Sequence, residues 1–289
     1  MQVARLPAPG NTVLGGTFHQ ISGGKGANQA VAASRAGGTV VLHAALGADV
    51  YGDELLRQYI TDGIDCTNVL RDANKATGTA VILVDGNGEN LIAVASGANL
   101  SVASPIPSAN VGAYLLQGEI NADAIFQTIG IASQSHIPVI LNNAPVISVP
   151  ARYRSCVDVL IVNEHEAGMM SGVRVHSKES ANAALTQLCA QGFGSVIITL
   201  GAAGIVWSTG DQHCYQPAFL VNPVDTTAAG DTFCGAFATR FVAGDVFGDA
   251  IRYAAAAAAL STLTVGAQSS IPDDSRVAAF LASAPMTHG

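Results

Sequence analysis

The sequence predicts an α/β fold in which a mainly parallel central sheet lies between layers of helices. From Val40 onward, short runs of β-branched and aliphatic residues alternate with stretches of helical periodicity, the pattern of successive β–α units. The chain has 289 residues, 49% apolar and only 12% charged, so it can bury a large core. Its 31 glycines fall in clusters, which indicates tight turns between elements rather than low complexity.

The expected elements follow one another without a Pro- or Ser-rich linker, so we expect a single domain over residues 1–289. The predicted strands are continuous apolar runs, typical of strands buried on both faces: 139–142, 157–162, 195–200 and 204–207. The predicted helices are alanine-rich or have apolar residues at helical spacing: 31–36, 181–191 and 232–242.

Residues 78–95 predict a β-hairpin. Two strand-like runs, 79–84 and 90–95, flank the sequence Asp85-Gly86-Asn87-Gly88, which is typical of tight hairpin turns. A hairpin is antiparallel, so it fits a flap over a site better than a member of a parallel sheet.

The charge of the chain argues against two classes of partner. Thirteen basic and 21 acidic residues give a formal net charge of −8. No basic face is then expected to neutralise a phosphate backbone or an anionic membrane, so we expect neither nucleic acid nor a membrane as partner. An anionic ligand must be held by a local arrangement of donors.

Neither a membrane span nor a signal peptide is expected, so the predicted location is the cytoplasm. The longest small-apolar run, residues 254–260, is far shorter than a membrane crossing requires, and residues 1–10 lack a signal-peptide core. The five cysteines are an odd number without Cys-x-x-Cys spacing, and we expect reduced, mostly buried thiols.

The first candidate site is Gly-Gly-Lys-Gly-Ala-Asn-Gln-Ala at residues 23–30, ahead of a helical stretch. It does not satisfy the P-loop pattern. Glycines before a helix let backbone amides approach a polar ligand, and Lys25 and Asn28 offer donors for hydroxyl groups. The alternative is a plain glycine turn into a helix, and the segment alone leaves both interpretations open.

The second candidate site is residues 224–233, where Ala229, Gly230 and Asp231 precede a helical run. Unsatisfied amides at a helix start can stabilise the negative charge on a phosphoryl group in transfer. A carboxylate beside them can accept the proton of an attacking hydroxyl. The alternative is that Asp231 merely caps its helix, which is the commoner role of a lone aspartate.

Two weaker motifs follow predicted strands, at the edge where open α/β sheets bind nucleotides. Residues 199–204, Thr-Leu-Gly-Ala-Ala-Gly, form an expected glycine turn. Asn163 and Glu166 follow the strand 157–162, and Glu166 is suited to organise the water shell of a Mg²⁺ ion. The same two residues would also suit an ordinary acidic helix start.

Together and in this order, the motifs resemble the PfkB family of sugar kinases, and within it the ribokinases. The resemblance runs from about residue 5 to 271. Residues 23–30 and the run Asp-Thr-Thr-Ala-Ala-Gly-Asp-Thr-Phe at 225–233 are its most specific parts. Supporting matches are Ala-Thr-Gly at 76–78, Gly-Ala-Asn at 97–99 and Gly-Ala-Gln at 266–268.

The resemblance implies a fold and a reaction. The fold is a ribokinase-like three-layer α/β/α sandwich with a mainly parallel sheet and a small β lid, formed by residues 3–20 and about 73–95. The reaction is ATP-dependent phosphorylation of D-ribose at its 5-hydroxyl, with Asp231 as the base and Ala228, Ala229 and Gly230 as the anion hole. An exposed edge of the lid favours a homodimer.

The resemblance also implies three sets of ligands. The sugar would be held by Gly24, Lys25, Gly26, Ala27, Asn28, Glu119 and Asp231. ATP would be held by Asn163, Thr199, Leu200, Gly201, Ala202, Ala203, Gly204 and Gly230, with Glu166 acting through Mg²⁺ waters. A K⁺ ion would be held by Asp225, Thr227, Ser261, Thr264, Gly266 and Ser270.

One departure from the family pattern leaves other functions open. Family members begin with a strand that ends in Gly-Ser-x-Asn-x-Asp, whose side chains grip the sugar, and the sequence as written starts after it. We therefore expect ATP binding with impaired ribose turnover. The alternatives are a weakened nucleotide- or sugar-binding remnant, and a PfkB kinase for another sugar or a nucleoside.

Overall fold

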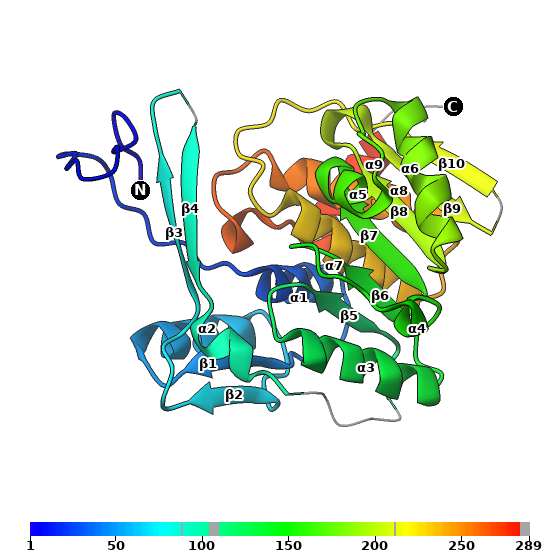
Figure 1. Ribbon diagram of the computed structural model, residues 1–289, viewed down its shortest axis with the longest axis horizontal. Coiled ribbons are helices and arrows are strands. Elements are labelled where there is room, and N and C mark those ends of the chain that lie inside the picture. The colour runs from blue at the N-terminus through cyan, green and yellow to red at the C-terminus, as the bar shows by residue number, and fades with distance from the viewer. Residues whose placement is uncertain (88, 104–109, 211, 284–289) are drawn as a thin grey trace.

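The central sheet holds six strands in the order β10-β9-β8-β7-β6-β5 in our computed structural model, which describes residues 1–87, 89–103, 110–210 and 212–283 (Figure 1). The four strands β5 to β8 are parallel, whereas β9 is antiparallel to β8 and β10 to β9. Their bounds are β5 Tyr114–Gln117, β6 Val139–Asn142, β7 Val159–Asn163, β8 Ser195–Thr199, β9 Ile205–Thr209 and β10 Gln212–Gln216.

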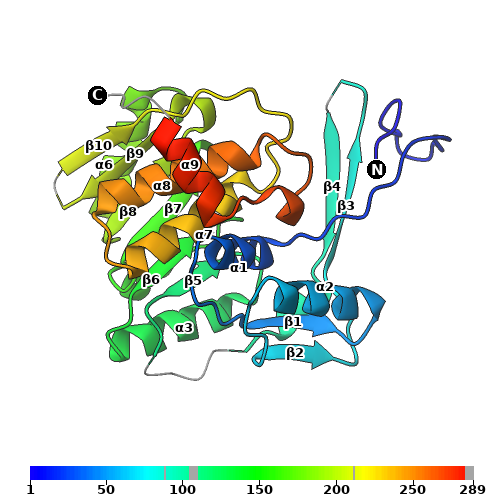
Figure 2. The same cartoon turned by 180° about the vertical axis from the view of Figure 1, so that it is seen from behind.

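Helices cover both faces of this sheet (Figures 1 and 2). One layer contains α1 (Lys25–Arg35), α7 (Ala229–Val242), α8 (Phe247–Ser261) and α9 (Asp274–Ser283). The other contains α3 (Ala122–Gln134), α5 (Glu164–Ser171) and α6 (Lys178–Ala190). The short elements are α4 (Ala151–Arg154), η1 (Gly97–Ser101), η2 (Gly201–Ala203) and η3 (Gln268–Ser270).

Strand β7 shows why the sequence gives two helical layers. Its side chains are apolar at every position from 159 to 162 and almost completely buried. Val159 and Ile161 pack in the core with helices α7 and α8, and Leu160 and Val162 pack in the core with helices α3 and α6. A strand with no polar face must be covered on both sides, which produces three layers.

Two small sheets extend the molecule beyond the central one. Strand β1 (Ala44–Gly47) pairs in parallel with β2 (Val69–Asp72), and helix α2 (Val50–Thr61) connects them. Strands β3 (Thr79–Val84) and β4 (Asn90–Ala95) form an antiparallel hairpin that stands away from the body (Figure 1). The backbone at Gln2 bridges to Thr17 and to Val84, so the N-terminal segment lies along the edge of β3.

Helices α1 and α7 pack against each other through small residues. A side chain at Gly235 would overlap the carbonyl oxygen of Gln29, and its Cβ would lie 2.7 Å from the Cβ of Ala32. The Thr239 hydroxyl donates to the Ala33 carbonyl at 3.0 Å. The two backbones therefore come close enough for side chains at the start of α1 to reach the start of α7.

The predicted α/β fold with a mainly parallel sheet is confirmed, and both hairpin strands have the predicted bounds. Residue 88 of the predicted turn lies outside the described residues. Two details were wrong. Helix α1 begins at Lys25 rather than at residue 31, and only Cys234 among the five free thiols is buried. The strand predicted at 204–207 spans residues 205–209 and is antiparallel to its neighbour β8.

In the part of the chain that the structure describes, none of the helices has both the length and the apolar character needed to cross a membrane.

Replacing Gly235 by alanine tests the α1–α7 packing. Glycine-to-alanine changes inside helices normally stabilise by about 0.5–1 kcal/mol, as we expect for Gly248→Ala, whose new Cβ would meet only the Trp207 ring at 3.7 Å. Gly235→Ala instead forces two helix backbones apart, and we expect a loss of about 1–3 kcal/mol in the free energy of unfolding. Thermal unfolding measures both, and equal melting temperatures for the two variants would contradict the packing argument.

Candidate functional site

A small cavity of about 240 Å³ lies where three parallel strands end. Asn142, Asn163 and Thr199 are the last residues of β6, β7 and β8, and all three line it. Lys25 from the start of α1 and Asp231 from the start of α7 also line it. Apolar strands thus deliver polar end residues to one place, the position at which open α/β sheets bind ligands.

The first turn of α7 presents backbone amides to this cavity. No side-chain hydrogen bond caps this helix within the described residues, and its N-cap residue Ala228 has a left-handed backbone with φ 60°. Such a conformation costs about 1–3 kcal/mol in a non-glycine residue and is found at functional sites. A Cβ at Gly230 would meet no atom within 4 Å, so space remains beside the helix start. The arrangement suits an anion.

The carboxylate of Asp231 is only 7% exposed and is held by two amide side chains. Asn28 Nδ2 donates to Oδ2 at 2.8 Å, and Gln29 Nε2 donates to Oδ1 at 2.9 Å. Burial raises the pKa of Asp231, and the Lys25 charge and the two amide donors work against that rise. Asp231 is thus a hydrogen-bonded acceptor rather than a simple helix cap.

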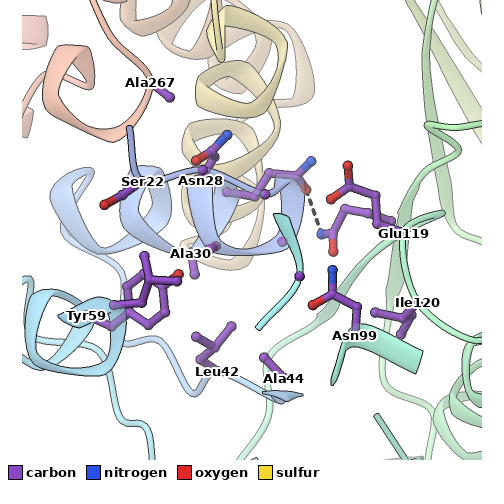
Figure 3. A pocket seen from close by; sticks show the side chains of 18 of the residues that line it. Ser22, Asn28, Ala30, Leu42, Ala44, Tyr59, Asn99, Glu119, Ile120 and Ala267 are labelled. Carbon is purple, nitrogen blue, oxygen red and sulfur yellow. Dashed lines mark hydrogen bonds between the residues drawn. The ribbon is translucent and has the colours of Figure 1, made fainter. Parts of the chain in front are cut away.

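A much larger cavity of about 2390 Å³ lies on the other side of Asn28. It extends between β1 and β5 and under the β3–β4 hairpin. Figure 3 shows Asn28, Asn99 and Glu119 arranged around it, together with apolar side chains such as Leu42. The Asn28 Oδ1 atom is buried and has no partner among the described residues, so an acceptor is left for a ligand hydroxyl.

The glycine-rich segment 23–28 forms one wall of the large cavity. Gly23, Gly24, Gly26 and Ala27 line it, and the backbone of Gly24 has φ 93°, which favours glycine. Glu119 accepts a hydrogen bond of 2.8 Å from the Lys25 amide at the start of α1. The side chain of Lys25 instead lines the small cavity, so this segment serves both cavities.

Asn163 and Glu166 form the helix start that the sequence left open, and they also lie at the small cavity. Asn163 Oδ1 accepts from the Glu166 amide at 2.8 Å, and Glu166 Oε2 accepts from the Asn163 amide at 2.9 Å, a reciprocal cap of α5. Both residues also line the small cavity. Burial raises the pKa of Glu166. Its carboxylate is an oxygen ligand of the kind that suits the hydration shell of Mg²⁺.

The glycine turn after β8 lies beside the small cavity rather than in it. Thr199 lines that cavity, whereas residues 200–204 line neither of the two cavities. Gly201 and Gly204 have φ of 54° and 90°, and the Tyr215 hydroxyl donates to the Ala203 carbonyl at 3.1 Å. Two glycines in the left-handed region and the Tyr215 hydrogen bond therefore fix the shape of the turn.

The proposed cation ligands are brought together only in part. Asp225 accepts hydrogen bonds from the amide and hydroxyl of Thr227 and from the Gly266 amide, at 2.6–2.9 Å. The hydroxyls of Ser261 and Ser270 donate to carbonyls near them in the chain. Burial works to raise the pKa of Asp225, but the hydrogen bonds from Thr227 and Gly266 outweigh it and lower that pKa. A carboxylate with hydroxyl and carbonyl oxygens around it is a donor set that fits a hard cation.

Other metal sites are not indicated within the described residues, where no group of three or more His, Cys, Asp or Glu side chains is placed to hold an ion. Thr264 lies in the exposed stretch before Gly266.

Sequence reasoning missed three polar residues of this network. Gln29 bonds to Asp231, and Gln117 and Asn142 each bond to Gln29. Gln29 and Asn142 are buried. Asn142 could have been predicted as a site residue, because it is a polar residue at the end of an apolar strand. Gln29 and Gln117 could not, since the contact between them depends on how α1 lies over β5.

This chain resembles known carbohydrate kinases over most of its length. The pfkB family of carbohydrate kinases matches residues 1–274. The chain is 37% identical to a ribokinase of Haemophilus influenzae, over 97% of this chain and 94% of that protein. It is 34% identical to a deoxyribokinase of Salmonella typhi, over 93% of this chain and 90% of that protein.

A solved structure gives the same picture of the fold. The ribokinase of Arabidopsis thaliana, complexed with ribose and ATP, superposes with a TM-score of 0.87 at 31% identity. The match covers 97% of this chain and 94% of that one. The three-layer architecture is therefore shared over nearly the whole chain.

Proposed function

This chain belongs to the pfkB family of carbohydrate kinases, and on that premise we propose that it transfers the γ-phosphoryl group of ATP to the 5-hydroxyl of D-ribose. One observation carries the proposal. Asp231 lines the small cavity beside the amides at the start of α7, and its carboxylate is hydrogen-bonded to Asn28, which lines the large cavity. A base that lines one cavity and is bonded to a residue of the other is placed to act between a sugar and a phosphate.

The sugar would occupy the part of the large cavity next to α1. The unpartnered Asn28 Oδ1 supplies an acceptor, and the backbone of residues 23–26 and the Glu119 carboxylate supply further polar groups. Hydroxyl groups need such paired partners when they leave water. The similarity to a deoxyribokinase keeps 2-deoxyribose as the second candidate substrate.

The phosphates of ATP would occupy the small cavity, with the rest of the nucleotide near the Gly201–Ala203 turn. Asp231 takes the proton of the attacking hydroxyl as the new O–P bond forms and the bond to the β-phosphate oxygen breaks. The amides of Gly230 and Asp231 and the Lys25 charge stabilise the negative charge on the transferring group. Mg²⁺, arranged near Glu166, would neutralise phosphate charge when bound.

The direct test is an assay of ADP release with ATP, Mg²⁺ and either D-ribose or 2-deoxyribose. We expect turnover with ribose, and Asp231→Asn lowers kcat by about two to four orders of magnitude because the base is lost. ATP binding by calorimetry stays close to wild type in this variant, which controls for folding. A variant that keeps most of its kcat would refute the base, and ATP binding without turnover in wild type would favour a binding protein.

A monovalent cation is the second expected requirement. We propose that K⁺ binds near Asp225, Thr227 and the loop at Gly266, directly before the anion hole. Replacing K⁺ by tetramethylammonium at equal ionic strength is expected to lower kcat at least about tenfold, equivalent to about 1.4 kcal/mol. Asp225→Asn weakens the response to K⁺ in the same assay. Equal rates in both salts would remove the cation from the proposed mechanism.

The hairpin is the proposed dimer contact. Ile82, Ile92 and Val94 share one face of β3–β4 and are 41%, 58% and 66% exposed. Ile82 and Val94 also line the large cavity, so a second copy on this face would border that cavity. A two-stranded sheet is marginal alone, so a second copy covering this face would stabilise it. We expect a dimer by light scattering and a monomer for Ile92→Lys, whereas Val246→Lys, at a 72% exposed site between α7 and α8, stays dimeric. A monomeric wild type would exclude this contact.

A further inference from the structure

We propose that Gln29 is a positioning residue of this reaction, which holds the carboxylate of Asp231 in one orientation, and that Gln117 in turn fixes the orientation of the Gln29 amide. The proposal rests on the proposed function, in which Asp231 is the base. Gln29 does not line the small cavity, where the phosphates would bind, but it lies among the residues around the large one. The proposal follows from a series of hydrogen bonds through the core.

The chain of hydrogen bonds uses every polar atom of the Gln29 side chain. Nε2 donates to Asp231 Oδ1 at 2.9 Å and to Asn142 Oδ1 at 3.0 Å. Oε1 accepts from Gln117 Nε2 at 2.7 Å. Gln117 Nε2 also donates to the Leu115 carbonyl at 3.2 Å, which ties the chain to the backbone of β5.

Burial protects this series of hydrogen bonds from competition by water. Gln29 is 0% exposed, and Asn142 is 7% exposed, so water does not replace a lost partner. Buried amide donors left unpaired cost more than exposed ones, and hydrogen bonds are stronger at low dielectric. The two donors of Gln29 therefore hold Asp231 and Asn142 at a fixed separation.

Gln117 determines which end of the Gln29 amide faces the base. A flipped amide would place Oε1 against the Asp231 carboxylate, an unfavourable contact between two acceptors. It would also place its NH₂ group against the NH₂ group of Gln117. The Gln117 donor thus selects the amide orientation that supports a charged carboxylate.

Asp231 also has charged and titratable neighbours on other elements. Lys25 faces it from the start of α1, and Cys234 lies one turn further along α7. Glu166 faces the same cavity from α5. None of these groups is altered by a change at Gln29, so a change in the titration of Asp231 can be traced to the amide.

The test combines three variants. Gln29→Met keeps the length of the side chain and removes both donors, and Gln117→Met leaves Gln29 in place but frees its orientation. Ser208→Ala is the matched control, because Ser208 is 1% exposed and its hydroxyl accepts from the Val196 amide. Ser208 lies three residues along β9 from Ile205, which pairs with the cavity-lining Thr199. Each variant removes a side-chain hydrogen bond.

Two measurements are made on each protein. The first is the pH profile of kcat with ribose, together with KM. The second is the titration of Asp231 in the substrate-free protein, followed by NMR with ¹³C-labelled aspartate and assigned with Asp231→Asn. The second measurement does not require turnover, so it tests Gln29 even if ribose is not a substrate.

Loss of donors to a carboxylate disfavours its charged form, so we expect Gln29→Met to raise the pKa of Asp231 by about one pH unit. The acidic limb of kcat then moves to higher pH by the same amount, and KM for ribose changes less than kcat. Gln117→Met shifts the pKa of Asp231 and the acidic limb of kcat in the same direction but by a smaller amount. Ser208→Ala lowers only the melting temperature.

Unchanged titration of Asp231 in both glutamine variants would overturn the proposal, as would an equal shift in Ser208→Ala. If Gln29→Met does not fold, Gln117→Met decides the outcome alone. A wild type without ribose turnover would reject the proposed function, whereas the NMR shift would still support or reject the role of Gln29.

Discussion

Close packing of helix α1 against helix α7 is the constraint on which the whole site depends. Gly235 allows the two backbones to approach, and the Thr239 hydroxyl bonds to the Ala33 carbonyl across the contact. At this separation, Asn28 and Gln29 on α1 reach the carboxylate of Asp231 on α7. With a larger residue at the crossing, the amides would no longer span the distance. The separation of α1 and α7 therefore determines the hydrogen bonds that hold Asp231.

The site concentrates arrangements that a structure built only for stability would avoid. It has a carboxylate that is almost fully buried, a left-handed alanine at residue 228 and a helix start without a side-chain cap. Each is unfavourable alone, and each leaves a group ready for a ligand. The surrounding layers are well-packed apolar clusters, which stabilise the fold enough to hold these groups in place.

The sequence was sufficient to predict the fold class, because continuous apolar runs and helical periods are local signals. The residues of β7 alternate between two cores, and this could be read from the run itself. The antiparallel direction of β9 could not, since an apolar strand carries no mark of its direction. Asp231 was found through its motif, whereas Gln29 and Gln117 meet only because elements 88 residues apart pack together. Such contacts depend on three-dimensional packing and leave no pattern in the chain.

Three residues on the first turns of α1 lie so close together that they limit which substitutions a kinase of this kind can accept. Lys25 lines the small cavity, Asn28 lines the large cavity and Gln29 bonds to Asp231, so a substitution at one of these positions is close to the contacts of the other two. Thr77 at the foot of the hairpin lines the same large cavity, but its hydroxyl bonds to Asp49 instead. In the proposed mechanism, substitutions on the hairpin side can therefore alter the large cavity while the contacts between α1 and α7 stay unchanged.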